Sequence, residues 1–133
     1  MNEATLDMNF VGLGLYVRTH LWSPAHKSYK HTFLTFDTGA SVTAMAPESL
    51  EILGYSPIKV NEQSLVTASG IEKTSIYLVE RIKVGGIELF DVEFHSVNFP
   101  NEGFSTGVLG LNVLRAFDMQ MLFSEKLIKL QKI

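Results

Sequence analysis

The apolar run at residues 33–36 ends abruptly in the tripeptide Asp37-Thr38-Gly39. Its aromatic and β-branched residues predict a buried strand. A carboxylate at the end of such a strand is unfavourable, because burial disfavours its charged form. The tripeptide is also a common turn sequence, with Asp at the start and Gly supplying a positive φ. Two interpretations therefore stay open at this point: an ordinary turn, or a carboxylate placed for chemistry.

The chain has 133 residues, which predicts a single domain over residues 1–133 with a core of its own. It contains no Cys, which excludes disulfides, thiolate metal sites and a Cys nucleophile. The polar, acidic first ten residues lack the basic start and apolar core of a signal peptide. No apolar run approaches the ~20 residues of a membrane helix. We therefore expect a cytoplasmic protein with no membrane segment in this chain.

The formal net charge is −3, and the Lys and Arg residues are scattered along the chain. A nucleic-acid surface usually shows a basic cluster, so the sequence predicts no nucleic-acid partner. His26 and His31 flank a predicted hairpin tip, but neither they nor His20 and His95 have the spacing of metal ligands. We expect neither a metal site nor a cofactor.

The first half of the chain reads as strands. Apolar residues alternate with other residues across residues 10–22, and this period of two predicts one long, half-buried strand. Residues 23–25 read Ser-Pro-Ala, which is a turn signal. Residues 29–36 then return as a second strand, so that a hairpin ends at Asp37.

The middle of the chain contains one helix signal and one further hairpin. Residues 46–54 have Pro47 near the start and Gly54 at the end, the positions that these residues prefer in a short helix. Residues 65–71 predict a hairpin whose tip is a Ser-Gly pair. Apolar residues then alternate along the returning strand, at Ile76, Leu78, Ile82 and Val84.

The last third of the chain contains short apolar segments separated by turn formers. The apolar parity changes between residues 87–89 and residues 90–94, which predicts a bulge or a strand buried on both faces. Two bulky residues between glycines at 107–110 predict a short buried strand that another backbone approaches closely. A helical turn at residues 111–116 and a hairpin at residues 117–131 follow. Many short strands predict an all-β, barrel-like domain.

Three features stand in a fixed order: Asp-Thr-Gly-Ala-Ser at 37–41 after an apolar strand, a hairpin near residues 69–70, and Val-Leu-Gly-Leu-Asn at 108–112. This order resembles the retropepsin-like aspartic proteases, the single-domain relatives of retroviral and pepsin-type enzymes. The helix at residues 47–53 resembles bacterial members. The resemblance covers residues 13–131, and it implies a closed retropepsin-like β-barrel with a flap hairpin and one or two short helices.

The resemblance also implies a role for each residue of the loop. Asp37 would be the catalytic carboxylate, and Thr38 would lock the loop against its partner through hydroxyl-to-backbone bonds. Gly39 would let a backbone N–H approach the carboxylate, and Ala40 would line the substrate groove. Residues 108–110 would pack beneath the loop.

The flap implied by the resemblance is the hairpin at residues 66–72, which would cover the substrate groove. Thr67, Ala68, Ser69 and Gly70 would then contact the bound substrate. We therefore count these four residues as candidate substrate-binding residues.

Two positions depart from the retroviral pattern. Retroviral members often carry Asp where Ser41 stands and Arg where Leu111 stands, and those two residues pair near the dimer interface. Neither charge is present here. The fold expectation is unchanged, but the usual contacts at that interface are not expected in this chain.

Hydrolysis of a peptide bond by carboxylates needs two of them, one to deprotonate the attacking water and one, protonated, to polarise the scissile carbonyl. Two carboxylates about 3 Å apart cannot both be ionised, so they share one proton. The Asp residues are Asp7, Asp37, Asp91 and Asp118, and only Asp37 is followed by Thr-Gly. The second carboxylate must then be Asp37 of another copy, related by a twofold axis.

The sequence therefore predicts a homodimeric aspartic-type endopeptidase, a hydrolase that acts on a peptide or protein substrate. Two alternatives stay open. One is a retropepsin-fold dimerisation or peptide-binding module without turnover, because a fold does not guarantee an activity. The other is an unrelated β-barrel in which Asp-Thr-Gly is only a turn.

Overall fold

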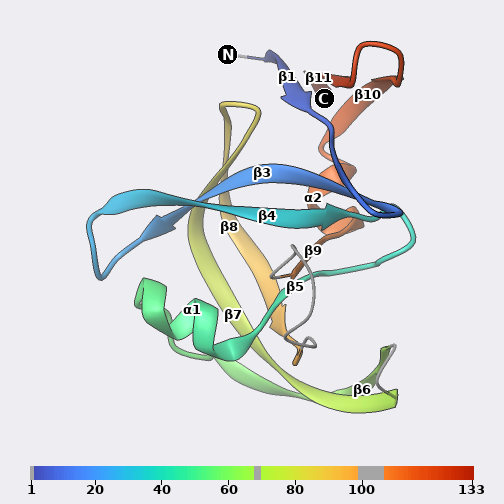
Figure 1. Ribbon diagram of the computed structural model, residues 1–133. Coiled ribbons are helices and arrows are strands. Elements are labelled where there is room, and N and C mark those ends of the chain that lie inside the picture. Colours follow the sequence, from blue (N-terminus) through green and yellow to red (C-terminus); the bar gives the residue numbers. More distant parts are fainter. Residues whose placement is uncertain (1, 68–69, 99–106) are drawn as a thin grey trace.

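The computed structural model describes residues 2–67, 70–98 and 107–133, and it describes their side chains except those of residues 60–73. Within these residues the elements are eleven strands and two short helices (Figure 1). In chain order they are β1 Glu3–Asp7, β2 Asn9–Val11, β3 Gly14–Ser23, β4 Ser28–Phe36, β5 Thr43–Met45, α1 Pro47–Leu53, β6 Lys59–Thr67, β7 Gly70–Val84, β8 Ile87–Ser96, β9 Gly107–Leu109, α2 Leu111–Leu114, β10 Phe117–Leu122 and β11 Leu127–Lys132. The chain is mostly β, as the sequence predicts.

The strands form two sheets. An eight-stranded sheet has the order β2-β3-β4-β9-β5-β8-β7-β6, and β3 pairs in addition with β7. That extra pairing joins Thr19 to Val84 and Leu21 to Ile82, which links strands near opposite ends of the order. A three-stranded sheet has the order β1-β11-β10 and carries both termini (Figure 1).

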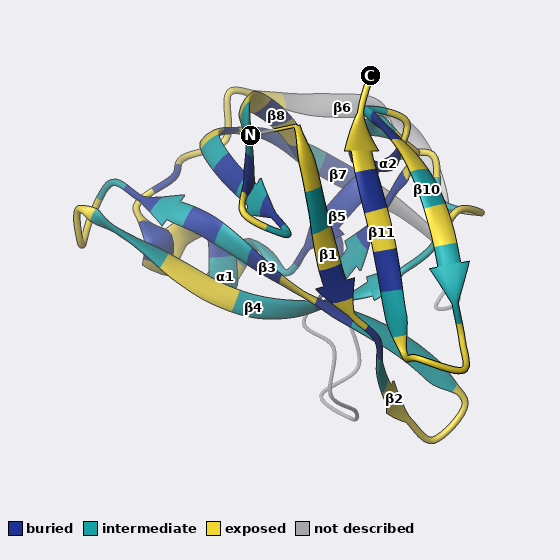
Figure 2. Cartoon of the chain, turned by 90° about the horizontal axis from the view of Figure 1, so that it is seen from above, coloured by how far each residue is buried: buried dark blue, intermediate teal, exposed yellow. Residues whose placement is uncertain are grey.

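The core is built from alternate residues of both sheets. Along β11 the buried side chains of Ile128 and Leu130 alternate with exposed neighbours, which gives the striped strand in Figure 2. In the hairpin of β3 and β4, Val17 lies opposite Leu34, and both are completely buried. This pairing holds the strand that leads into the Asp37 loop against the core.

Helix α1 has the bounds that its terminal residues predict. Pro47 begins the helix after an extended Ala46, and Gly54 ends it with a positive φ of 106°. The backbone N–H of Tyr55 donates to the carbonyl of Leu50, which closes the last turn. Neither α1 nor α2, the helices of the described residues, is long and apolar enough to cross a membrane.

The single long strand predicted over residues 10–22 is wrong. The chain turns at Gly12, which has a φ of 58°, and this turn separates β2 from β3. Leu13, which the alternating pattern places in the core, is fully exposed at this turn. The apolar alternation continued across the turn by coincidence, because a period-two pattern carries no information on chain direction.

The change of apolar parity predicted between residues 87–89 and residues 90–94 is confirmed, because β8 is locally irregular there. Asp91 in β8 has a φ of 52°. Before Asp91 the buried side chain is that of Ile87, at an odd-numbered position, whereas just after it the buried side chain is that of Val92, at an even-numbered position. The opposite strand β7 shifts as well, so that Val79 is buried while Leu78 is 39% exposed. The predicted core position of Leu78 is therefore wrong.

His95 on β8 gives the fold a dependence on pH. It is buried, and its Nδ1 lies 3.4 Å from Oγ1 of Thr74. Burial lowers the pKa of His95; nearby Lys59 lowers it further, whereas Glu93 raises it. The folded chain therefore binds fewer protons than the unfolded chain below about pH 6.5, the ordinary pKa of His.

We expect the free energy of unfolding to be level above about pH 7 and to fall as the pH drops through about 6.5. The His95→Gln variant should lose less stability over the same range, because it has no imidazole to protonate. Urea unfolding at pH 7.5 and 5.5 measures this difference. The control is His31→Gln, because His31 is exposed on β4. Equal slopes for wild type and His95→Gln would contradict the assignment.

Candidate active site

Strand β4 delivers Asp37 to the surface through a parallel pairing with β9. Thr35 lies opposite Val108, and Phe36 lies opposite Leu109. The pairing continues one residue further, because the backbone N–H of Asp37 donates to the carbonyl of Leu109 at 3.2 Å. Residues 108–110, which the resemblance places beneath the loop, therefore lie beside it. Their pairing with β4 fixes the point at which Asp37 leaves the sheet.

The Asp-Thr-Gly tripeptide forms a tight turn that holds the carboxylate by the backbone. The N–H of Gly39 donates to Oδ1 of Asp37 at 2.9 Å, and the N–H of Ala40 donates to the Asp37 carbonyl at 3.2 Å. A Cβ atom at Gly39 would lie 3.1 Å from Oδ1 of Asp37, which is a tight contact. Gly at this position therefore leaves room for the carboxylate oxygen.

The chain after the turn is fastened to the segment that begins α2. The N–H groups of Leu111 and Asn112 donate to the carbonyls of Ala40 and Ser41, at 2.8 and 3.3 Å. A Cβ atom at Gly110 would lie 2.3 Å from the carbonyl oxygen of Val42. This close approach of two backbones is the one that the glycine pattern predicts.

Asn112 holds the strand that follows the loop, and sequence reasoning did not assign it a role. Its Oδ1 accepts from the N–H of Thr43 at 2.8 Å and from Oγ1 of Thr43 at 2.7 Å. Its Nδ2 donates to the carbonyl of Glu93 at 2.9 Å. Oγ1 of Thr43 also accepts from the N–H of Gly110 at 3.1 Å. The one available signal was an Asn in an otherwise apolar segment.

Replacing Asn112 by Ala should destabilise the fold by roughly 2–4 kcal/mol, since the buried Thr43 loses two hydrogen bonds at once, from its N–H and from its hydroxyl. The loop after Asp37 should then shift, so any activity of the site should fall as well. Urea unfolding measures the first effect. Asn98→Ala, at an exposed position, is the matched control. A change of less than about 0.5 kcal/mol in Asn112→Ala would contradict this role.

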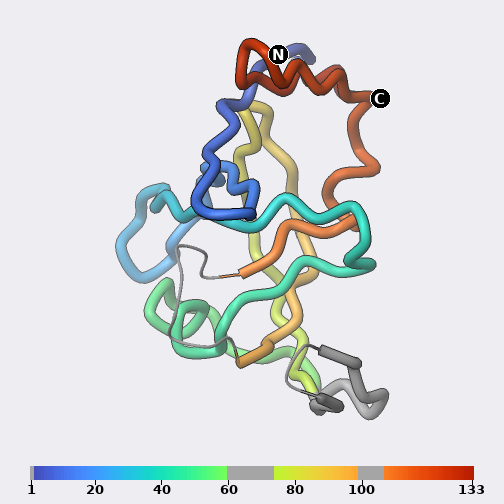
Figure 3. The backbone as a smooth tube through the Cα atoms, turned by 45° about the vertical axis from the view of Figure 1, so that its right-hand side comes forward, coloured from blue at the N-terminus to red at the C-terminus, as the bar shows by residue number. Residues whose placement is uncertain are grey.

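The tip of the loop is open to solvent in the single chain. Asp37 is half-buried, whereas Thr38, Gly39 and Ser41 are exposed, and the turn projects at one side of the chain (Figure 3). Leu111, beside Ala40, leaves 40% of its surface exposed. The side chain expected to contact a partner, Thr38, is therefore accessible.

The other Asp residues do not join this loop, because Asp7 lies on β1, Asp91 on β8 and Asp118 on β10. Among the described residues, no group of three or more His, Asp or Glu side chains could hold a metal ion.

The candidate flap is the hairpin of β6 and β7. Thr67 lies opposite Gly70, the last pair of that ladder. Ala68 and Ser69 lie outside the described residues, and only the backbone of Thr67 and Gly70 is described. The backbone pairing gives the hairpin that the sequence predicts, and the contact of these four residues with a substrate stays a prediction.

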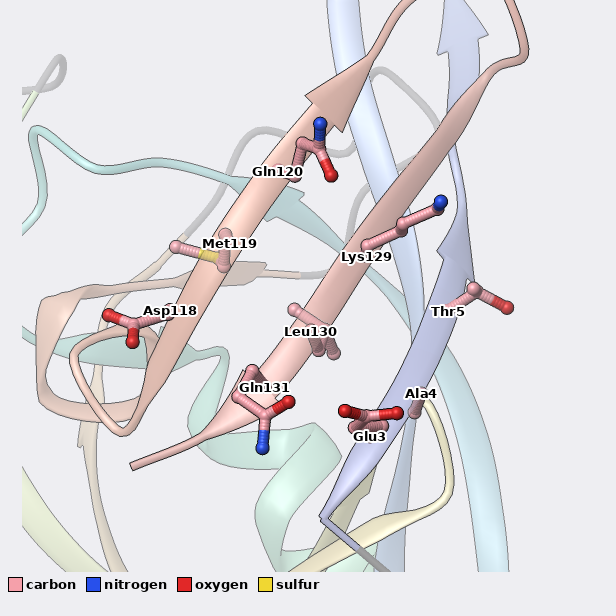
Figure 4. Close-up of a pocket in the computed structure, with 9 residues that line it drawn as sticks. All are labelled: Glu3, Ala4, Thr5, Asp118, Met119, Gln120, Lys129, Leu130 and Gln131. Carbon is pink, nitrogen blue, oxygen red and sulfur yellow. The ribbon is translucent and has the colours of Figure 1, made fainter.

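A hollow of about 670 Å³ lies elsewhere, on the three-stranded sheet (Figure 4). Its lining comes from β1, β10 and β11, with Glu3 and Asp118 as its acidic side chains and Lys129 as its basic one. No residue of the Asp37 loop lines it. Its carboxylates lie on strands rather than in a turn that holds them through backbone N–H groups, so we do not assign it catalysis.

Residues 27–116 match the family model described as gag-polyprotein putative aspartyl protease. No curated protein matches the chain. Among solved structures, the chain is similar to the crystal structure of a retropepsin-like aspartic protease from Rickettsia conorii, with a TM-score of 0.68 and 20% sequence identity over 98% of this chain and 90% of that one. The chain therefore belongs to the gag-polyprotein aspartyl protease family, and its fold is similar to that of a retropepsin-like aspartic protease.

Proposed function

We propose that this chain is a homodimeric aspartic endopeptidase in which two Asp37 carboxylates, one from each subunit, activate a water molecule. One observation supports this more than any other. The carboxylate of Asp37 is held by the N–H of Gly39 at the exposed end of a buried strand, in a chain of the aspartic protease family.

The chemistry follows from the pairing of two carboxylates. One, ionised, takes a proton from the water as it attacks the scissile carbonyl. The other, protonated, donates a hydrogen bond to the carbonyl oxygen and stabilises the negative charge that develops there. The N–H of Gly39 fixes the orientation of each Asp37. One proton is shared between the pair, because two like charges at this separation repel.

The second carboxylate requires a second copy. The remaining Asp residues lie on strands away from the loop, and Thr38 and Gly39 at its tip are exposed. A twofold axis between two such tips would bring the two Asp37 side chains together and cover both Thr38 side chains. Leu111 would add apolar contact near the axis, in place of the charged pair of retroviral members.

Substrate binding in this proposal uses the groove between the two loops and the flap. Ala40 would line the groove, and Thr67, Ala68, Ser69 and Gly70 would close over an extended peptide. The closed form of the barrel belongs to this proposal as well. Its support is the β3–β7 pairing, which links distant strands of the eight-stranded sheet.

Turnover of a peptide library by the purified chain tests the proposal, with light scattering to give the molecular mass. We expect cleavage, inhibition by a statine-type transition-state analogue, and the mass of a dimer. A dimer that binds peptides without cleaving them would instead identify a peptide-binding module. A monomer without turnover would leave Asp-Thr-Gly as a turn.

Thr38→Ala should weaken the dimer more than it weakens the fold. Its hydroxyl is exposed in the single chain, and each lost hydrogen bond at the axis costs on the order of 1 kcal/mol. Two lost bonds per dimer correspond to roughly 30-fold in the dissociation constant. Sedimentation at matched concentrations measures this, with Ser56→Ala, at an exposed position, as the control. An unchanged dissociation constant would count against the locked loop.

A further inference from the structure

The outer face of β3 and β4 carries aromatic and basic side chains at every second position. The register of the hairpin places Arg18 opposite Phe33, His20 opposite His31, and Trp22 opposite Tyr29. Alternate residues of a strand point to the same face, so these six share one side of the sheet. We call this surface, together with Arg81 and Lys83 of the adjacent strand β7, the aromatic–basic face.

The cations of β7 lie over the rings of the hairpin. The guanidinium carbon of Arg81 lies 3.9 Å from the centre of the Trp22 ring and 5.7 Å from that of Tyr29. Nζ of Lys83 lies 4.4 Å from the centre of Tyr29. These positions follow from the backbone, because β7 pairs with β3 so that His20 lies opposite Lys83.

The rings also contact one another along and across the strands. Trp22 and Tyr29 meet edge to face with centroids 5.4 Å apart. His31 contacts Phe33 at 6.4 Å and His20 at 6.2 Å, and the guanidinium carbon of Arg18 lies 5.3 Å from the Phe33 ring centre. The face is therefore a row of contacting rings, with cations over the rings of Phe33, Trp22 and Tyr29.

The positive charge of this face is only partly compensated. Burial lowers the pKa of His20, and the neighbouring His31, Arg18 and Lys83 lower it further. The hydroxyl of Tyr29 donates to the carboxylate of Glu88, which brings one negative charge against these rings. Arg18 and His31 are exposed, so positive charge and ring surface reach solvent together.

A hollow of about 240 Å³ continues the face at the end of Arg18 and Phe33. Gly85 and Gly86 line it together with Arg18 and Phe33. Asp7 lines the same hollow, so one carboxylate lies at its edge. The hollow provides room for a group that follows the ring surface towards Arg18.

We propose that the aromatic–basic face binds single-stranded nucleic acid. A sheet surface with aromatic side chains on neighbouring strands stacks unpaired bases, and flanking cations bind the phosphates. This chain combines both on one surface: Tyr29, His31 and Phe33 on one strand, and Arg18, Arg81 and Lys83 around them. An acidic polypeptide would use the cations but would leave the rings without a matching partner, so the observations favour nucleic acid.

The sequence carries a direct reporter for this proposal. Trp22 is the only tryptophan of the chain, and it lies on this face, where Arg81 contacts its ring. A base that stacks on the face should change the emission of Trp22, whereas ligands bound elsewhere should leave it unchanged.

Fluorescence titration of the full chain with a thymidine 12-mer tests the proposal. We expect saturable quenching of Trp22 and an affinity that falls with rising salt, as counterion release requires. Arg18→Glu and Lys83→Glu should each weaken binding by tenfold or more, and Phe33→Leu, which keeps an apolar side chain, should reduce the quenching. Lys129→Glu, at an exposed position on β11, is the charge-matched control and should bind as wild type.

Two results would overturn the proposal. The first is an absence of quenching by the 12-mer, or equal binding by the Arg18→Glu, Lys83→Glu and Lys129→Glu variants. The second is binding of polyglutamate as tightly as the 12-mer, which would identify an acidic protein as the partner. Circular dichroism confirms that each variant is folded, and Arg18→Ala replaces Arg18→Glu if the charge reversal unfolds the chain. The readout is binding, so it is independent of the proposed proteolysis.

Discussion

Replacing Asp37 by Asn is expected to abolish peptide hydrolysis while the chain still folds. Both carboxylates of the proposed pair come from Asp37, so a single substitution removes the general base and the proton donor together. An amide cannot accept the proton of the attacking water. We expect a loss of roughly 10⁴-fold or more in kcat/KM, since each of the two proton-transfer roles contributes about 10²- to 10⁴-fold.

The fold should tolerate this change, because Asn has nearly the same shape and its Oδ1 can still accept from the N–H of Gly39. Circular dichroism and the urea midpoint should match those of wild type within about 0.5 kcal/mol. Asp91→Asn is the matched control: Asp91 is exposed in β8 with a φ of 52°, which Asn tolerates. Turnover retained in Asp37→Asn on the best substrate would remove Asp37 from the mechanism.

Replacing Gly110 by Ala is expected to destabilise the chain by about 3 kcal/mol or more and to displace the Asp37 loop. The added Cβ would lie 2.3 Å from the carbonyl oxygen of Val42 and 3.0 Å from that of Ala40. Both contacts are with backbone, which cannot swing away as a side chain can. Gly110 has a φ of −102°, which Ala adopts freely, so the effect is steric.

The control for Gly110→Ala is Gly12→Ala. Gly12 has a φ of 58° and no atom within 4 Å of an added Cβ, so that variant measures backbone strain without a clash. We expect it to lose only about 1–2 kcal/mol. Urea unfolding and turnover are measured for both. A stable and fully active Gly110→Ala chain would show that the two backbones separate easily, and that the loop does not need this close packing.

Local signals predicted much of the fold. Pro47 and Gly54 set the ends of α1, because the preferences of Pro and Gly act within one turn of a helix. The hairpin of β3 and β4 followed from a turn signal between alternating segments. The strand predicted over residues 10–22 failed at Gly12, since a local pattern does not show where the chain reverses.

The candidate site was predictable only in its local part. The turn at Asp37 depends on contacts within four residues, such as the bond from Gly39 to the carboxylate. The bonds of Asn112 to Thr43 join residues 69 positions apart, and no local preference indicates such a partner. The sequence therefore predicted the turn at Asp37 but not the side chain that holds the following strand.

The sequence by itself determined the residue types and their local geometry: a carboxylate in a tight turn, alternating strands, and a helix between Pro47 and Gly54. Only the tertiary structure decided which distant strands became neighbours. Lys and Arg residues that look scattered in the sequence lie together on the aromatic–basic face, because the pairing of β7 with β3 brings Arg81 and Lys83 beside Trp22 and Tyr29. The physical reason is that strand pairing depends on the packing of the whole core, whereas turns and helix ends depend on a few adjacent residues.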